Sequence, residues 1–282
     1  TSISSKIEGY DWSIDNLLPL CTNEQILYLS ENIPHPLDHL YANKVFCFDL
    51  DPLNDASQIA RIHTILGKYP NMVPVYGWPD MKYATKPGQD NVTVENAGVQ
   101  ILTQEGKFLV ASDLCSNLSF FNAAGSKSDS ALYLQPPHRL LEYDPSKQYV
   151  VFLFSDGDNL QYDFNKMKAL WSVDVSRSEK YSMDWTIDPS LPRMAPWAYE
   201  HLQVQLRASL PQSRFVAGPS GAGYVRPSLL VSSALTQFIT LTDQWNQFAD
   251  LDGISSIDDT GNEDSVYRQF AQKKNIRSIF MV

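Results

Sequence analysis

Short apolar runs recur along the chain at intervals of roughly 30 residues, and eight of them have the length and composition of β-strands. Several are apolar at consecutive rather than alternate positions, which is typical of parallel strands covered on both faces. We therefore expect a buried parallel sheet. The eight runs occupy residues 45–50, 72–78, 107–112, 149–155, 182–187, 214–218, 252–257 and 277–282.

Segments with the apolar spacing of amphipathic helices lie between these runs. In residues 56–69, for example, Ile59, Ile62 and Leu66 fall on one helix face. Further helices are predicted for residues 160–175, 196–208, 227–248 and 263–274.

The alternation of strands and helices predicts the fold class. Repeated strand–helix–strand units give right-handed crossovers and parallel sheets, so we expect an α/β protein. Eight units in this length fit a single (β/α)8 barrel of the TIM type over residues 1–282, irregular over residues 114–149. A doubly wound open parallel sheet is the alternative.

The charge of the chain limits the classes of partner that we expect it to bind. A formal net charge of −10, with no cluster of Lys and Arg, disfavours nucleic acid and anionic membranes. No apolar run is long enough to insert into a membrane, and residues 1–5 do not resemble a signal peptide, so we expect that any targeting segment has been removed. Because the chain stops within its last predicted strand, we expect a fragment of a longer, multidomain protein.

Polar, aromatic and glycine residues follow the predicted strands. In a barrel all these positions meet at one rim, where such enzymes place their chemistry. The candidates at this rim are Asp49, Trp78, Asp156, Asp158, Asn159, Trp185, Asp188, Ser220, Gly221, Gly223, Tyr224 and Asp258.

A ring of carboxylates mixed with aromatic side chains suits carbohydrate. Carboxylates accept hydrogen bonds from sugar hydroxyls, and a pair of carboxyl groups is the equipment for glycoside hydrolysis. Asp156 and Asp158, in the sequence SDGDN, are the first candidates for this pair. The next candidates for acid, base or substrate contact are Asp49, Asp188 and Asp258, and those for lining sugar subsites are Trp78, Trp185 and Tyr224.

Other interpretations of the same residues stay open. Asp156 and Asp158 are also suited to capping a helix that begins near Leu160, or to holding a divalent cation. The two tryptophans are equally suited to a core. The glycine-rich residues 218–224 lack the lysine of a phosphate-binding loop, and Ser220 lacks the surroundings of a nucleophilic serine, so we expect no nucleotide and no serine hydrolase.

Four ordered segments resemble the bacterial GxGYxYP family of proposed glycoside hydrolases. The name-giving motif corresponds to Gly221-Ala-Gly-Tyr-Val-Arg-Pro227, and the other similar segments are residues 9–19, 155–161 and 185–189. The sequence departs from the motif at Arg226, where the family has its second tyrosine. The resemblance implies a glycoside hydrolase that is secreted, periplasmic or at the cell surface, works in polysaccharide utilisation and carries further domains. It makes the motif residues, including Arg226, candidates for substrate binding.

The sequence therefore predicts hydrolysis of a poly- or oligosaccharide by paired aspartates, without an organic cofactor. Two alternatives remain. One is a glycan-binding module without catalytic activity on the same scaffold. The other is a metal-dependent, deacetylase-like hydrolase that uses Asp156 and Asp158 as ligands.

Overall fold

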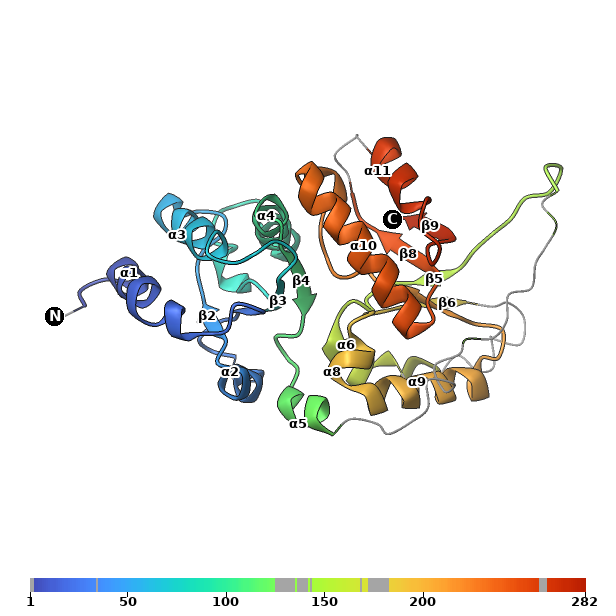
Figure 1. Cartoon of the computed structure of the whole chain (residues 1–282), viewed down its shortest axis with the longest axis horizontal. Coiled ribbons are helices and arrows are strands. Elements are labelled where there is room, and N and C mark those ends of the chain that lie inside the picture. The colour runs from blue at the N-terminus through green and yellow to red at the C-terminus, as the bar shows by residue number, and fades with distance from the viewer. Residues whose placement is uncertain are drawn as a thin grey trace.

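The chain folds as an α/β protein with two parallel sheets, as the computed structural model in Figure 1 shows. The N-terminal half, in blue to green, holds one sheet, and the C-terminal half, in yellow to red, holds the other. The structure describes residues 3–33, 35–124, 135, 142, 144–167, 169–171, 183–258 and 263–282.

The first sheet has four strands in the order β2-β1-β3-β4, so the chain moves outward from β1 in both directions. This order is typical of doubly wound sheets. Its strands are β1 (Ile26–Tyr28), β2 (Phe46–Phe48), β3 (Pro74–Gly77) and β4 (Phe108–Ala111). The helical segments of this half are α1 (Lys6–Asn16), η1 (Leu18–Leu20), α2 (Leu37–Asn43), α3 (Ala56–Leu66), η2 (Met81–Tyr83), α4 (Asn91–Gln104) and α5 (Leu118–Ala123).

The second sheet has five strands that follow one another in chain order, as in half of a (β/α) barrel. Its strands are β5 (Leu153–Phe154), β6 (Asp184–Ile187), β7 (Phe215–Ala217), β8 (Gly253–Ser256) and β9 (Ser278–Met281). Its helical segments are α6 (Leu160–Asn165), α8 (Leu191–Met194), α9 (Pro196–Ser209), η4 (Pro227–Leu229), α10 (Ser232–Ala249) and α11 (Glu263–Phe270).

The parallel α/β class is confirmed, whereas the single closed barrel is not. Each of the eight predicted runs contains a strand, but β1 was not predicted, and it lies between β2 and β3. The described strands form two sheets rather than one continuous ring. A doubly wound parallel sheet, the alternative, is compatible with this arrangement. The excursion predicted for residues 114–149 lies largely outside the described residues.

Side chains at the helix ends explain why the helices begin where they do. The Asp55 carboxylate accepts the backbone N–H groups of Ser57 and Gln58 at the start of α3. Asp90 forms a capping box with Thr93 at the start of α4, and α9 begins at a proline. These local signals fix the helices that flank the strand ends.

Two contacts join the sheets along β4. Tyr224 exchanges two backbone hydrogen bonds with Leu109, with N···O distances of 3.0 and 2.8 Å, and Ala111 pairs with Asn159. We call this junction the seam. A Cβ atom on Gly223 would lie 2.4 Å from the Phe108 ring, so only glycine lets the loop after β7 approach β4 this closely.

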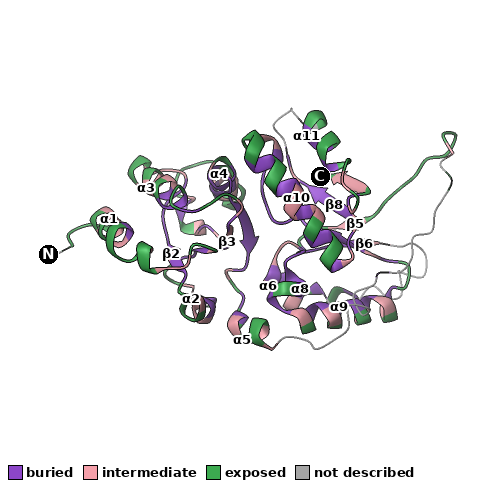
Figure 2. Cartoon of the chain, viewed as in Figure 1, coloured by how far each residue is buried: buried purple, intermediate pink, exposed green. Residues whose placement is uncertain are grey.

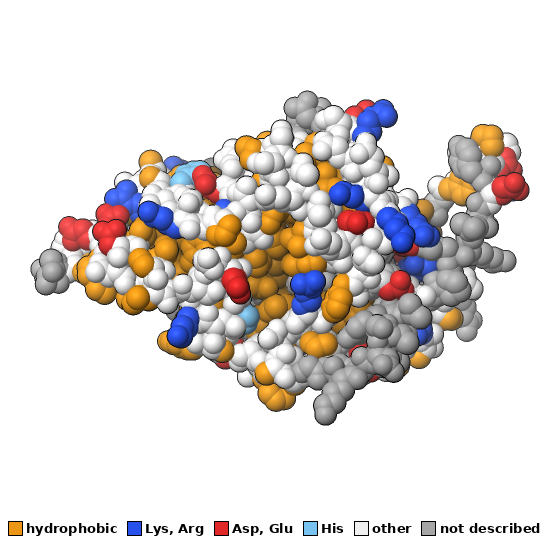
Figure 3. Space-filling model, viewed as in Figure 1, with side chains coloured by type: hydrophobic (Ala, Val, Ile, Leu, Met, Phe, Trp, Pro, Cys, Tyr) orange, Lys and Arg blue, Asp and Glu red, His pale blue; other side chains and the backbone are white. Residues whose placement is uncertain are grey.

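One hydrophobic core extends across the seam. Phe108 and Val110 of β4 belong to the same buried cluster as Trp185 and Phe215 of the second sheet. Figure 2 shows the buried strands in purple and the exposed outer sides of α9 and α10 in green. On the face shown in Figure 3, acidic and basic side chains are scattered and form no extended basic patch. Among the described residues, no helix has the length and apolar character needed to cross a membrane.

Candidate active site

The SDGDN segment follows β5 and lies where the ends of neighbouring strands converge. A Cβ atom on Gly157 would lie 1.7 Å from the backbone oxygen of Thr186, so the loop passes directly over the end of β6. The Gly157 N–H also donates to the Thr186 hydroxyl at 2.8 Å. The backbone of Gly218, after β7, packs against Asp158. The N-cap of α6 is Asn159 rather than either aspartate, and its side chain makes no capping hydrogen bond.

Asp158 is partly exposed, yet protein atoms surround its carboxyl group closely. Burial, followed by the negative charges of Asp188, Asp156 and Glu95, raises the pKa of Asp158 to about 7. A carboxyl group with this pKa holds a proton through a large part of the neutral range. Asp156, by contrast, is exposed to solvent.

Asp188 and Asp163 form the buried side of this site, and each is only 1% exposed. Burial raises the pKa of Asp188 to about 7, although Oδ1 accepts the Ser190 backbone N–H at 2.7 Å. Burial, followed by the charge of Asp188, raises the pKa of Asp163 well above its usual range.

Within the described part of the chain, several oxygens on this buried side have no hydrogen-bond partner. They include both carboxyl oxygens of Asp163 and Oδ2 of Asp188. Because an unpaired buried charge is costly, burial favours the protonated forms of Asp163 and Asp188. The charge of each carboxyl group also affects its neighbours, so the proton equilibria of Asp158, Asp163 and Asp188 are coupled. The structure thus brings together the predicted residues Asp156, Asp158 and Asp188. We call these three carboxyl groups, with Asp163 and Glu95, the acidic cluster.

Glu95 reaches the cluster from the other half of the molecule and was not predicted as a site residue. It lies in the first turns of α4, and its Oε1 accepts a hydrogen bond from the Tyr224 hydroxyl at 3.0 Å. Burial raises the pKa of Glu95, and the charge of Asp156 adds to the rise, whereas Tyr224 and Arg226 oppose it. In the sequence, the signal for the helix that carries Glu95 was the Asp90–Thr93 capping pair, followed by apolar residues at helical spacing.

Arg226 replaces the second tyrosine of the motif and lies behind Glu95. Its guanidinium donates to Asn96 Oδ1 at 2.7 Å. Its positive charge opposes the rise in the pKa of Glu95 but does not cancel it. The side chain is 7% exposed, so its most direct effect in this structure is electrostatic, through the glutamate.

Asp113, after β4, lies at the edge of the cluster and was also not a candidate. Its Oδ1 accepts a hydrogen bond from Gln161 of α6 at 2.9 Å, and burial raises its pKa. The ends of β4, β5, β6 and β7 therefore all supply groups to this region.

Two other predicted carboxylates lie in separate hydrogen-bond networks. Asp49, at the end of β2, binds the Lys82 ammonium at 2.5 Å and the Tyr83 hydroxyl at 2.7 Å. Asp258, after β8, accepts the Ser228 backbone N–H at 2.8 Å and its hydroxyl at 2.6 Å. These bonds hold both carboxylates in place within the fold, and their catalytic roles stay predictions.

The aromatic and motif residues differ in their placement. Trp185 is 1% exposed and stacks on Phe154 within the core, with ring centroids 4.7 Å apart, and Trp78 is partly buried against the core of the first half. The enclosed position of Trp185 does not support sugar stacking, and the sugar-stacking role of Trp78 stays a prediction. Ser220, Gly221, Gly223 and Tyr224 are buried, and Asn159 is partly buried at the seam. In the described part of the chain, no three His, Cys, Asp or Glu side chains are arranged to hold a metal ion. Cation binding by Asp156 and Asp158 stays a prediction.

Comparisons with known proteins agree with the motif. Residues 23–123 match the third domain of the GxGYxYP family, and residues 146–282 match the "GxGYxYP putative glycoside hydrolase C-terminal domain". A search of curated proteins found no match. The crystal structure of a "putative hydrolase" from Bacteroides thetaiotaomicron VPI-5482 is similar to this chain, with a TM-score of 0.80 and 22% identity.

That similarity supports the fold alone, because the identity is low. It covers 96% of this chain but only 49% of the Bacteroides protein, so the chain spans about half the length of its structural relative. The two family matches lie on either side of the seam, and each contains one of the two sheets. On these matches, the chain belongs to the GxGYxYP family.

Proposed function

We propose that this chain hydrolyses glycosidic bonds at the acidic cluster. The observation that carries the proposal is the position of Asp158, which is partly exposed at the strand ends, is surrounded by other carboxyl groups and has a pKa raised to about 7. The family name, which includes glycoside hydrolase, supports the same chemistry. The substrate class is accordingly a poly- or oligosaccharide.

The roles follow from the environment of each carboxyl group. Asp158 holds a proton near neutral pH and donates it to the oxygen of the departing sugar, as a general acid. Asp156 is exposed on the same loop and serves as the second carboxyl group, acting on the sugar directly or through water. Glu95 acts through Asp158, because its negative charge raises the pKa of Asp158, and Asp188 acts through Asp158 because the proton equilibria of the two carboxyl groups are coupled.

The test is a hydrolysis screen with matched variants. Plant, host and bacterial glycans are incubated with the wild-type chain and with Asp158→Asn, Asp156→Asn and Asp90→Asn, and the release of reducing ends is measured. We expect the first two substitutions to lower kcat by at least about 10²-fold, the usual contribution of a general acid or base. Asp90→Asn replaces the aspartate that caps α4, the helix that carries Glu95, with another good N-cap residue, so its activity should match the wild type.

Each reaction is repeated with EDTA. Activity that survives EDTA and disappears in Asp158→Asn and Asp156→Asn supports the two-carboxyl mechanism. Activity lost with EDTA would instead favour a metal-dependent hydrolase, and glycan binding without turnover would favour a binding module.

A further inference from the structure

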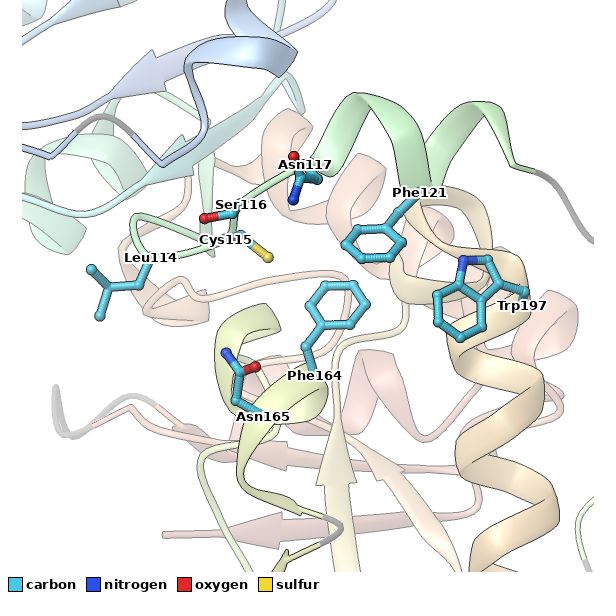
Figure 4. A pocket seen from close by; sticks show the side chains of 8 residues that line it. All are labelled: Leu114, Cys115, Ser116, Asn117, Phe121, Phe164, Asn165 and Trp197. Atoms are coloured by element: carbon cyan, nitrogen blue, oxygen red, sulfur yellow. The ribbon is translucent and has the colours of Figure 1, made fainter.

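An aromatic pocket lies beside the acidic cluster. Its volume is about 320 Å³, and three rings line it, Phe121 from α5, Phe164 from α6 and Trp197 from α9 (Figure 4). Ligand pockets usually enclose roughly 300–1,000 Å³, so this one has room for a single sugar ring rather than a long chain segment.

The three rings form one packed group. Phe121 stacks on Phe164 with ring centroids 5.0 Å apart and an interplanar angle of 19°, and its centroid lies 5.5 Å from that of Trp197. Trp197 nonetheless remains 41% exposed. Its indole therefore presents a rigid apolar surface that the C–H face of a pyranose can cover.

Neutral polar groups complete the lining. Ser116, Asn117 and Asn165 supply a hydroxyl and two amides, which are suited to sugar hydroxyls. Ser116 Oγ already contacts His35 Nδ1 at 2.8 Å, which fixes its position. None of the described lining residues is charged, whereas carboxyl groups lie near one of them, Cys115. The local field therefore disfavours phosphates and uronic acids.

The pocket and the acidic cluster share a wall. Cys115 lines the pocket, and burial, followed by the charges of nearby aspartates that include Asp163, Asp113 and Asp188, raises the pKa of its thiol. Phe164 directly follows Asp163 in α6. The pocket therefore lies next to the buried side of the acidic cluster.

We propose that the aromatic pocket is a subsite for one neutral sugar ring of the substrate. The inference rests on the proposed function for its context, because a subsite serves the cleavage of a chain that extends beyond the acidic cluster. Its binding chemistry is independent of catalysis and is measurable without turnover.

The test uses the Asp158→Asn chain, which holds a glycan without cleaving it. Calorimetric titrations with cellotetraose, xylotetraose, mannotetraose and maltotetraose are compared with a titration with tetragalacturonate. The second substitution is Trp197→Ala, and its control is Trp12→Ala in α1, which removes a tryptophan of similar exposure, 46% against 41%. We expect at least one neutral tetrasaccharide to bind, and Trp197→Ala to weaken it roughly tenfold or more while Trp12→Ala does not.

Three results would overturn the inference: binding of none of the neutral sugars, equal weakening by both substitutions, or tetragalacturonate binding as tightly as the neutral ligands. The two proposals fail separately. If Trp197→Ala does not change hydrolysis, the subsite proposal is wrong and the catalytic role of Asp158 is unaffected. If sugar binding depends on Trp197, the subsite proposal holds even when no glycan is cleaved.

Discussion

At the scale of single residues, the buried carboxyl groups of the acidic cluster lower the stability of the folded chain when they ionise. Asp188 is buried and one of its oxygens has no partner, so the folded state binds its proton more tightly than the unfolded chain does. Since the folded pKa of about 7 lies above the unfolded value of about 3.9, Asp188 makes the free energy of unfolding fall as pH rises between these values. Asp158 acts in the same direction.

The substitution Asp188→Asn removes this penalty. The amide resembles the protonated carboxyl group in shape, and its oxygen is still able to accept the Ser190 N–H. At pH 8 we expect the melting temperature to rise by about 2–8 °C, which corresponds to about 1–3 kcal/mol for a chain of this size. At pH 4 the two proteins should melt together. Differential scanning calorimetry at both pH values checks this, and an equally destabilised variant at pH 4 and pH 8 would contradict it.

Residue patterns revealed part of this site. Asp156, Asp158 and Asp188 follow β5 and β6, so the rule that parallel strand ends meet at one edge was enough to group them. Glu95 was missed because its partner Tyr224 is 129 positions away and because the helix that carries it was not predicted. Asp163 was missed because its side chain faces the protein interior from a helix, where a charged residue is not expected.

At the scale of elements, apolar runs predicted the strands well. The strand β4, for example, is buried at every position, so its consecutive apolar residues mark it clearly. The strand β1 was not predicted, and its insertion between β2 and β3 gives a doubly wound order in place of the expected ring order. Strand order depends on which crossover each helix makes, and no local pattern records it.

The GxGY segment is a structural link between the loop after β7 and strand β4, and not only a loop that contacts a ligand. It pairs with β4 at Leu109 and orients Tyr224 toward Glu95. We therefore predict that Gly223→Ala lowers the free energy of unfolding by about 1–3 kcal/mol, because the new methyl group meets the Phe108 ring at 2.4 Å.

The matched control for Gly223→Ala is Gly9→Ala. Position 9 lies within helix α1, where a Cβ atom finds its nearest neighbour at 3.5 Å. Alanine there should be neutral or stabilising by about 0.5–1 kcal/mol. Urea unfolding of both variants checks the pair, and equal stabilities would show that the close approach at the seam is unimportant.

At the scale of the whole molecule, one hydrophobic cluster and the acidic cluster both contain residues of the two halves. Buried residues of both halves belong to a common hydrophobic cluster, although separate family models match the two halves. We therefore predict a single cooperative unfolding transition in calorimetry. Two resolved peaks, or a native-like near-ultraviolet dichroism spectrum for residues 23–123 expressed alone, would show that the halves are independent.

The central claim is that Asp158 protonates the departing sugar, and an activated leaving group tests it most directly. Dinitrophenolate leaves without protonation, so general-acid variants retain activity on dinitrophenyl glycosides while losing activity on natural glycans. With the sugar that the screen identifies, we predict that Asp158→Asn lowers kcat/KM on the natural glycan at least about 10²-fold more than on its dinitrophenyl glycoside. Equal losses on both substrates, or no loss on either, would contradict a general-acid role for Asp158.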